Sequence, residues 1–330
     1  MNKSSMKAVI ATGYGGPDVL EVQEVSLPTP KTDEILVRVT ATSVTAATSV
    51  MRTGKPYLGR LFLGLRRPKA KIPGTDLAGV VEGVGAEVTR FKVGDKVIAE
   101  TGIDCGAHAE YICLSENELV VHQPENLSPE EATGILDGGS TALAFFTDSV
   151  SLTPGDKVLI NGASGSIGTA AIQLAKVFGA EVTAVCSGRN FELVRSLGAD
   201  HVIDYTKGSV YESGGEYDVI FDTVGKLSFR KSKALLNPNG VFLSPVLNLP
   251  TLWSVITSFL FGSKKLKFAA TGMRKKDLQM RDLRKLRELL VAGRLKTVID
   301  RHYSMDQIRE AHQYIDTGRK RGNVVLSFAH

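Results

Sequence analysis

The strongest constraint on the fold is a glycine-rich stretch that lies between two apolar segments. Gly162, Gly165 and Gly168 occur in VLINGASGSIGTAAIQLAKVFGAEVTAVC, after a strand-like run and before an amphipathic helix. Glycines at this spacing permit a tight turn and let backbone amides approach a pyrophosphate at the helix N-terminus. The pattern predicts a βαβ unit that binds a dinucleotide; the alternative is a glycine-rich turn without a ligand.

Strands and helices alternate along the chain from this stretch onward, which predicts a doubly wound parallel sheet of the Rossmann type. The first part instead contains short extended runs separated by Gly, Pro and Asp turns, which indicates a β-rich domain. A charged helix over 275–292, a helix over 305–315 and a last strand are expected to rejoin that domain. We therefore predict a β-rich domain of residues 1–127 and 273–330 and a Rossmann domain of residues 128–272.

The segment after the second Rossmann strand should select between the two nicotinamide cofactors, because it lies about 20 residues beyond the fingerprint. Residues 186–190 read CSGRN and contain no carboxylate to hold a ribose diol. Arg189 and the Ser187 hydroxyl can receive a 2′-phosphate, and one charge pair at about 4 Å is worth about 4 kcal/mol before desolvation. NADPH is therefore the predicted cofactor. If Arg189 is instead a solvated residue at a helix start, the choice of cofactor is loose.

Composition and targeting signals restrict the class of protein. The net charge of +5 is too small to suggest nucleic acid as a partner. Three cysteines without a C-x-x-C pair fit reduced thiols, and the N-terminus lacks a secretory signal, so we expect a cytoplasmic protein. The apolar stretch 241–262 is interrupted by two prolines and is too short for a membrane span.

A basic segment over 52–71 carries seven Lys or Arg residues with aromatic and leucine side chains between them. We interpret it as a mobile flap near the active cleft. The alternative is a surface that contacts a membrane or an acidic partner.

Three segments resemble the medium-chain dehydrogenase/reductases: GTDLAGVVEGVGAEVTRFKVGDKV over 74–97, the NGASGSIG fingerprint, and GRKRGNVVLSF near the C-terminus. Within that superfamily the chain is similar to quinone oxidoreductases, including mitochondrial and chloroplast-envelope homologues. The resemblance implies an α/β protein with a GroES-like β-rich catalytic domain and a Rossmann cofactor domain. It also implies a homodimer.

Zinc-dependent members of the superfamily place a Cys in the early loop, a Gly-His-Glu motif before the hallmark, and a four-Cys lobe. Here the early loop reads SVTAATS, Thr75 replaces the ligand His, and three cysteines cannot form the lobe. We predict no metal. Cys105 and His108 lie close together in the sequence, and we interpret them as part of a turn beside a strand.

Without zinc, the enzyme should reduce quinones or α,β-unsaturated carbonyls, which delocalise the incoming negative charge. The predicted catalytic residues are the hydroxyl donors Thr45, Thr48 and Tyr57. The family commonly has Asn where Thr45 stands and an acidic residue where Thr48 stands, and each hydroxyl could instead cap a turn. The alternative functions are an enoyl-thioester reductase with Tyr57 as proton donor, and a non-catalytic NADPH-binding scaffold or sensor.

The predicted cofactor contacts come from the fingerprint, from the end of the second strand and from the resemblance. The alternative for Tyr205 is that it is only an aromatic residue at a strand end in the core. The apolar run 247–261 could line an acceptor pocket for a long hydrophobic substrate, or form a buried helix or dimer contact. The predicted partner is a small hydrophobic quinone or enone. The full set of predicted contacts is Thr141, Gly162, Ser164, Gly165, Ser166, Ile167, Gly168, Ser187, Arg189, Asn190, Tyr205, Val224, Gly225 and Asn323.

Overall fold

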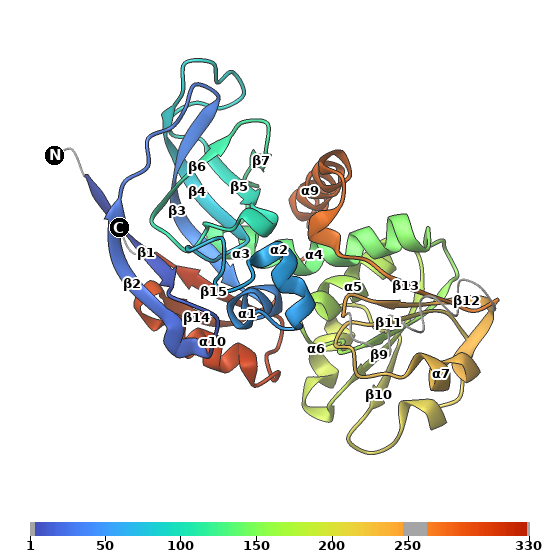
Figure 1. Ribbon diagram of the computed structural model, residues 1–330. Coiled ribbons are helices and arrows are strands. Elements are labelled where there is room, and N and C mark those ends of the chain that lie inside the picture. The colour runs from blue at the N-terminus through green and yellow to red at the C-terminus, as the bar shows by residue number, and fades with distance from the viewer. Residues whose placement is uncertain (1–3, 247–262, 329–330) are drawn as a thin grey trace. The chain divides into compact units, whose positions relative to one another are not determined.

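The computed structural model describes residues 4–246 and 263–328, and the chain divides into two compact units (Figure 1). The first unit comprises Met1–Asp137 and Gly272–His330, and the second comprises Gly138–Thr271. The predicted apolar run 247–261 lies outside the described residues. We take each unit by itself.

The first unit contains a two-stranded antiparallel sheet and a seven-stranded sheet. The small sheet pairs β1 (Ser5–Ala11) with β2 (Leu20–Ser26). In the large sheet β15 pairs antiparallel with the long central strand β3 and parallel with β14, which brings the C-terminal strand into this unit. The order is β14-β15-β3-β4-β5-β7, with β6 on β3. Their bounds are β3 (Glu34–Val44), β4 (Asp76–Val84), β5 (Lys96–Glu100), β6 (Tyr111–Ser115), β7 (Leu119–His122), β14 (Ile299–Ser304) and β15 (Asn323–Ser327).

Helices of the first unit pack on this large sheet. A capping box between Ser128 and Glu131, with Pro129 as the first helical residue, begins α3 (Pro129–Gly134). This helix packs against β3, β4 and β15, so it belongs to the first unit. The remaining helices are α1 (Ala46–Thr53), α2 (Arg60–Leu63), α9 (Lys276–Val291) and α10 (Ile308–Asp316), with 3₁₀ turns at Pro17–Val19, Tyr57–Gly59, Gly102–Asp104 and Met305–Gln307.

The second unit is the predicted doubly wound Rossmann fold. Its six strands are all parallel to their neighbours, in the order β10-β9-β8-β11-β12-β13. The order reverses between β8 and β11, which is the switch point where such sheets bind ligands at their carboxyl edge. The strands are β8 (Lys157–Asn161), β9 (Glu181–Cys186), β10 (His201–Asp204), β11 (Tyr217–Asp222), β12 (Leu236–Ser244) and β13 (Lys265–Phe268).

Buried apolar side chains fill the space between that sheet and its helices. The rings of Phe145 and Phe146 lie with their centroids 5.0 and 5.6 Å from that of Phe221 on β11. The helices are α5 (Ser166–Val177), α6 (Phe191–Ser196), α7 (Phe229–Ser232) and α4 (Leu136–Ala144), whose first two residues belong to the first unit; α4 continues as a π-helical turn (Phe145–Ser149). Further 3₁₀ turns lie at Gly188–Asn190, Val210–Glu212, Lys233–Leu235 and Thr271–Met273.

The basic segment over 52–71 is the one that we interpret as a mobile flap near the active cleft. It contains α1, a 3₁₀ turn and α2, and its first cation is not on the surface. Arg52 is only 2% exposed, lies 2.5 Å from the carboxylate of Asp316 and donates to the carbonyl oxygen of Gly15 at 2.7 Å. A buried guanidinium needs such partners, so Arg52 ties α1 to α10.

Candidate active site and cofactor site

The glycine fingerprint forms a tight loop between β8 and α5. Gly162 has φ +75°, and a Cβ at Gly168 would lie 2.2 Å from the carbonyl oxygen of Gly162, which no side chain tolerates. Gly165 precedes the first helical residue of α5 and offers no side-chain cap. The first N–H groups of a helix lack partners within the helix, so this N-terminus suits a phosphate.

A buried carboxylate organises the loop after β11, and sequence reasoning missed its role. Asp222 accepts hydrogen bonds from Asn161 Nδ2 at 2.8 Å, from the backbone N of Gly225 at 3.1 Å and from the backbone N of Leu227 at 2.7 Å. These bonds hold Val224 beside Gly162, because a Cβ on that glycine would lie 2.7 Å from Val224 Cγ1. The loop after β8 and the loop after β11 therefore pack against each other at the carboxyl edge of the sheet.

The end of β9 brings three of the predicted contacts together. Asn190 is buried and donates through Nδ2 to Ser164 Oγ at 2.9 Å and to Ser187 Oγ at 3.3 Å. Its Oδ1 has no hydrogen-bond partner within the described part of the chain. An unsatisfied buried acceptor beside a fingerprint loop fits a ligand hydroxyl such as that of a ribose. Arg189 is exposed on the adjoining turn.

A carboxylate does lie near this region, contrary to our inference from residues 186–190. Asp204 ends β10, and its register partner in the parallel pair with β9 is Cys186. Asp204 Oδ2 lies 2.8 Å from where a Cβ of Gly188 would be. Hydrogen bonds from the Thr206 hydroxyl and backbone N–H hold the pKa of Asp204 below its usual range, so the group is charged.

The remaining predicted cofactor residues occupy different positions in the two units. Thr141 is buried in the second unit with its Oγ 3.2 Å from that of Thr271. Tyr205 is 57% exposed, which excludes the alternative that it is a core aromatic. Asn323 is buried in the first unit and donates through Nδ2 to the carbonyl oxygen of Val298 at 3.0 Å. Ser166 and Ile167 begin α5.

Two predicted catalytic hydroxyls form the N-terminal cap of α1. Thr45 Oγ1 accepts from the backbone N of Thr48 at 3.2 Å, and Thr48 Oγ1 accepts from the backbone N of Thr45 at 3.0 Å and donates to the Thr45 carbonyl oxygen at 2.8 Å. Both side chains are buried. The Thr48 hydroxyl therefore has its donor occupied, which favours the capping role that the sequence left open.

Tyr57 lies in the 3₁₀ turn after α1 and is 66% exposed. The Arg60 guanidinium carbon lies 4.8 Å from the centre of its ring. Within the described residues its hydroxyl makes no hydrogen bond, so the hydroxyl is available to a ligand.

Two buried titratable residues clamp the start of the early loop, a role that sequence reasoning missed. Asp76 accepts from Ser43 N at 3.0 Å, from Ser43 Oγ at 2.6 Å and from Thr133 Oγ1 at 2.9 Å. His108 Nε2 lies 3.0 Å from the Ser43 carbonyl oxygen. Burial raises the pKa of Asp76 to about 6 and lowers the pKa of His108 to about 4. At neutral pH His108 is therefore neutral and donates through Nε2–H.

The residues at the position of the catalytic zinc do not fit a metal. Zinc-dependent members of the superfamily have a ligand His where Thr75 stands, and the Thr75 hydroxyl is 3.4 Å from Asp76 Oδ2. In the part of the chain that the structure describes, no three His, Cys, Asp or Glu residues are arranged to hold an ion. A neutral hydroxyl is a poor zinc ligand.

Comparison with known proteins identifies the family of this chain. Residues 31–129 match the family described as alcohol dehydrogenase GroES-like domain, and residues 197–326 match the one described as zinc-binding dehydrogenase. The chain is 35% identical to the chloroplastic quinone-oxidoreductase QR1 of Triphysaria versicolor, over 97% of this chain and 98% of that protein. It is a quinone oxidoreductase-like member of the medium-chain dehydrogenase/reductase superfamily.

Other members of the superfamily share both the sequence and the fold. The 2-methylene-furan-3-one reductase of Solanum lycopersicum is 34% identical over 98% of this chain and 79% of that protein. The solved quinone oxidoreductase of Coxiella burnetii has a TM-score of 0.85 and 26% identity, and the match covers 98% of this chain and 99% of that one. Among the described residues of this family member, no helix is long and apolar enough to cross a membrane.

Proposed function

We propose that this protein is an NADPH-dependent reductase of quinones and α,β-unsaturated carbonyls that works without a metal. The proposal rests on the groups around the glycine loop that could contact a dinucleotide. They are the uncapped N-terminus of α5, the buried Asn190 with its unsatisfied Oδ1, and Arg189 on the next turn. Bound NADPH supplies the hydride. The α5 N-terminus would hold its pyrophosphate, and Arg189 with Ser187 would hold the 2′-phosphate.

The residues of the early loop support an acceptor that is easy to reduce. Thr75 is a poor substitute for the His that holds zinc, and in the zinc-dependent enzymes it is the zinc ion that stabilises an alkoxide. The Thr48 hydroxyl already donates its proton within the capping box. Quinones and enones delocalise the negative charge that arrives with the hydride, so they need less stabilisation from the protein. Two relatives are named for the same two classes of acceptor: one is a quinone oxidoreductase and the other a 2-methylene-furan-3-one reductase.

Tyr57 supports a second candidate, an enoyl-thioester reductase. Its exposed phenol hydroxyl has no hydrogen-bond partner in the described residues and could donate the proton that follows hydride transfer. In this case Tyr57→Phe should lower turnover of an enoyl-coenzyme A thioester much more than turnover of a quinone. An equal loss of turnover with both substrates, or no loss with either, would exclude the enoyl-thioester reductase and favour the quinone and enone proposal.

The test of the main proposal is NADPH oxidation by metal-free protein with a quinone and with an enone, and NADH is measured in parallel. Turnover that chelator treatment leaves unchanged, with a lower KM for NADPH than for NADH, is the expected result. Tight NADPH binding without oxidation across both acceptor classes would refute the catalytic proposal and favour a scaffold or sensor. Turnover that is restored only by added zinc would refute the metal-free mechanism.

Location and assembly are part of the proposal. We propose a cytoplasmic homodimer that makes at most peripheral membrane contact and binds no nucleic acid. The three cysteines are all free, which suits a reducing compartment, although the QR1 relative is chloroplastic. Light scattering of the eluted protein should give twice the mass of 35.5 kDa, and a monomer mass would refute the dimer.

A further inference from the structure

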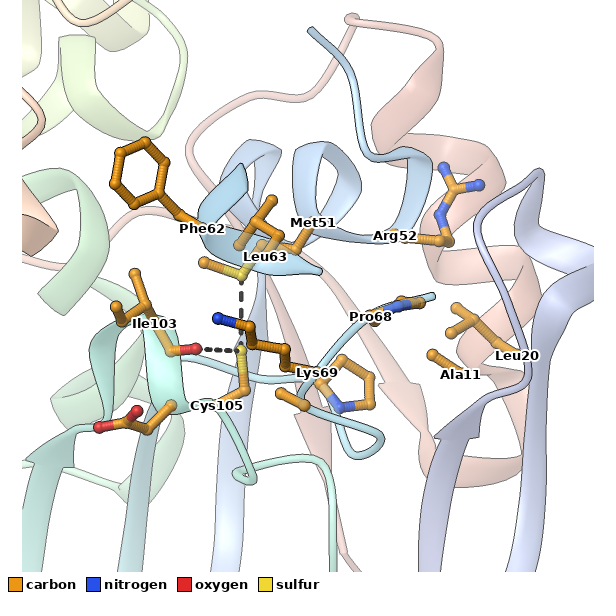
Figure 2. Close-up of a pocket in the computed structure, with 13 residues that line it drawn as sticks. Ala11, Leu20, Met51, Arg52, Phe62, Leu63, Pro68, Lys69, Ile103 and Cys105 are labelled. Carbon is orange, nitrogen blue, oxygen red and sulfur yellow. Dashed lines mark hydrogen bonds between the residues drawn. The ribbon is translucent and has the colours of Figure 1, made fainter. Parts of the chain in front are cut away.

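A cavity of about 330 Å³ lies entirely within the first unit (Figure 2). Its walls come from α1, α2, the loop that follows α2, and the turn that ends at Cys105. Apolar side chains form most of the lining, among them Met51, Phe62, Leu63, Pro68 and Ile103. A cavity of this volume with such walls is at the lower end of the range for small-molecule sites, about 300–1,000 Å³.

Two cations line this cavity, and their environments differ. The guanidinium of Arg52 points away from the cavity in Figure 2 and is occupied by Asp316, by the Gly15 carbonyl oxygen and by His312 Nδ1. Arg52 therefore has a structural role and offers the cavity its carbon chain. It is not a receptor for a ligand.

Lys69 has the opposite environment. Figure 2 shows its side chain reaching across the cavity, between Leu63 and Cys105 and toward Ile103. Among the described residues the Lys69 ammonium forms no hydrogen bond or ion pair. A cation that extends over an apolar surface without a partner favours an anionic group on a ligand that also covers that surface.

The other charged group at the cavity is the carboxylate of Asp104, an exposed residue beside Cys105. It limits the charge that a ligand can carry. A single ammonium can hold a monoanion, whereas a phosphate group would require more donors than Lys69 supplies.

We propose that this cavity binds an amphipathic monocarboxylate, with its aliphatic or aromatic part against Met51, Phe62 and Leu63 and its carboxylate on Lys69. The site uses residues of the first unit alone. Its occupancy needs no cofactor, so the proposal stands or falls separately from the proposed reductase function.

The test is calorimetric titration of the full chain with octanoate and, as the uncharged match, octanol. Lys69→Met should weaken octanoate binding by up to about fivefold, the upper end of what an exposed ion pair contributes, and leave octanol binding unchanged. Asp104→Asn should strengthen octanoate binding. Lys71→Met is the matched control, because Lys71 is exposed in the same loop and does not line the cavity.

A second measurement places the ligand. Cys105 lines the cavity and Cys113 on β6 does not, so octanoate should slow alkylation of Cys105 by a maleimide and leave the rate at Cys113 unchanged. Ala70→Phe should fill the cavity and abolish binding of both probes; circular dichroism checks that this variant folds.

Several outcomes would overturn the proposal. Equal octanoate affinities for Lys69→Met, Lys71→Met and the unchanged protein would exclude Lys69 as the receptor. Unchanged Cys105 alkylation at saturating octanoate would place the ligand elsewhere. Binding to anionic phosphatidylserine vesicles but not to octanoate would show that the basic and apolar segment over 55–71 contacts a membrane surface instead.

Discussion

The choice of cofactor should depend on Arg189, and replacing it tests the cofactor site directly. A charge-assisted hydrogen bond contributes about 1.5–3 kcal/mol, and Arg189 is exposed, so solvent screening places its contribution near the lower limit. Arg189→Ala should therefore raise the KM for NADPH about tenfold, since about 1.4 kcal/mol corresponds to a factor of ten. The KM for NADH should change little, because NADH has no 2′-phosphate.

Steady-state kinetics with both cofactors and one quinone is the assay. Asp204→Asn is the complementary variant: its carboxylate lies beside Gly188 and opposes a phosphate there, so the substitution should lower the KM for NADPH. Arg195→Ala is the matched control, because Arg195 lies six residues further along the chain, in α6, and stacks on Phe191. Equal changes in the two KM values for Arg189→Ala would refute the assignment of the 2′-phosphate to this turn.

Three further predictions follow from close packing and burial. Gly168→Ala should abolish binding of both cofactors and lower the Tm, because its Cβ would lie 2.2 Å from the Gly162 carbonyl oxygen; normal calorimetric binding would refute this packing. The folded pKa of His108 is about 4, below its usual 6.5, so protonation favours the unfolded chain and stability is lost as pH falls from 6.5 toward 4. The unchanged protein should therefore lose more unfolding free energy between about pH 7 and pH 4.5 than His108→Gln, which keeps a donor for Ser43. The difference should be about 2 kcal/mol by urea titration. An equal loss in the two proteins would contradict the burial of a neutral ring. Burial raises the thiol pKa values of Cys105, Cys113 and Cys186 to about 11. Iodoacetamide should therefore label all three slowly near neutral pH and faster toward pH 11, as mass spectrometry of each site can show. Rapid labelling at neutral pH would contradict the burial of that thiol.

The sequence by itself determined the features that depend on short stretches of chain. The glycine spacing at 162, 165 and 168 requires a tight turn before a helix, and the alternation of strands and helices after it predicts the parallel sheet. The predicted helix over 275–292 corresponds to α9 (Lys276–Val291). These predictions succeeded because glycine conformation and apolar periodicity are local properties.

Only the tertiary structure decided which distant groups meet. Asp204 lies beside Gly188 because β10 pairs in parallel register with β9, and no spacing within residues 186–190 could reveal it. Arg52 is neutralised by Asp316, which is 264 residues away in the sequence. Burial therefore decides what a charged side chain does. Arg52 is buried and makes a structural contact, whereas Lys69, in the same basic segment, is available to a ligand. Strand register and burial are set by the packed chain as a whole, because desolvation and pairing depend on neighbours that local sequence does not specify.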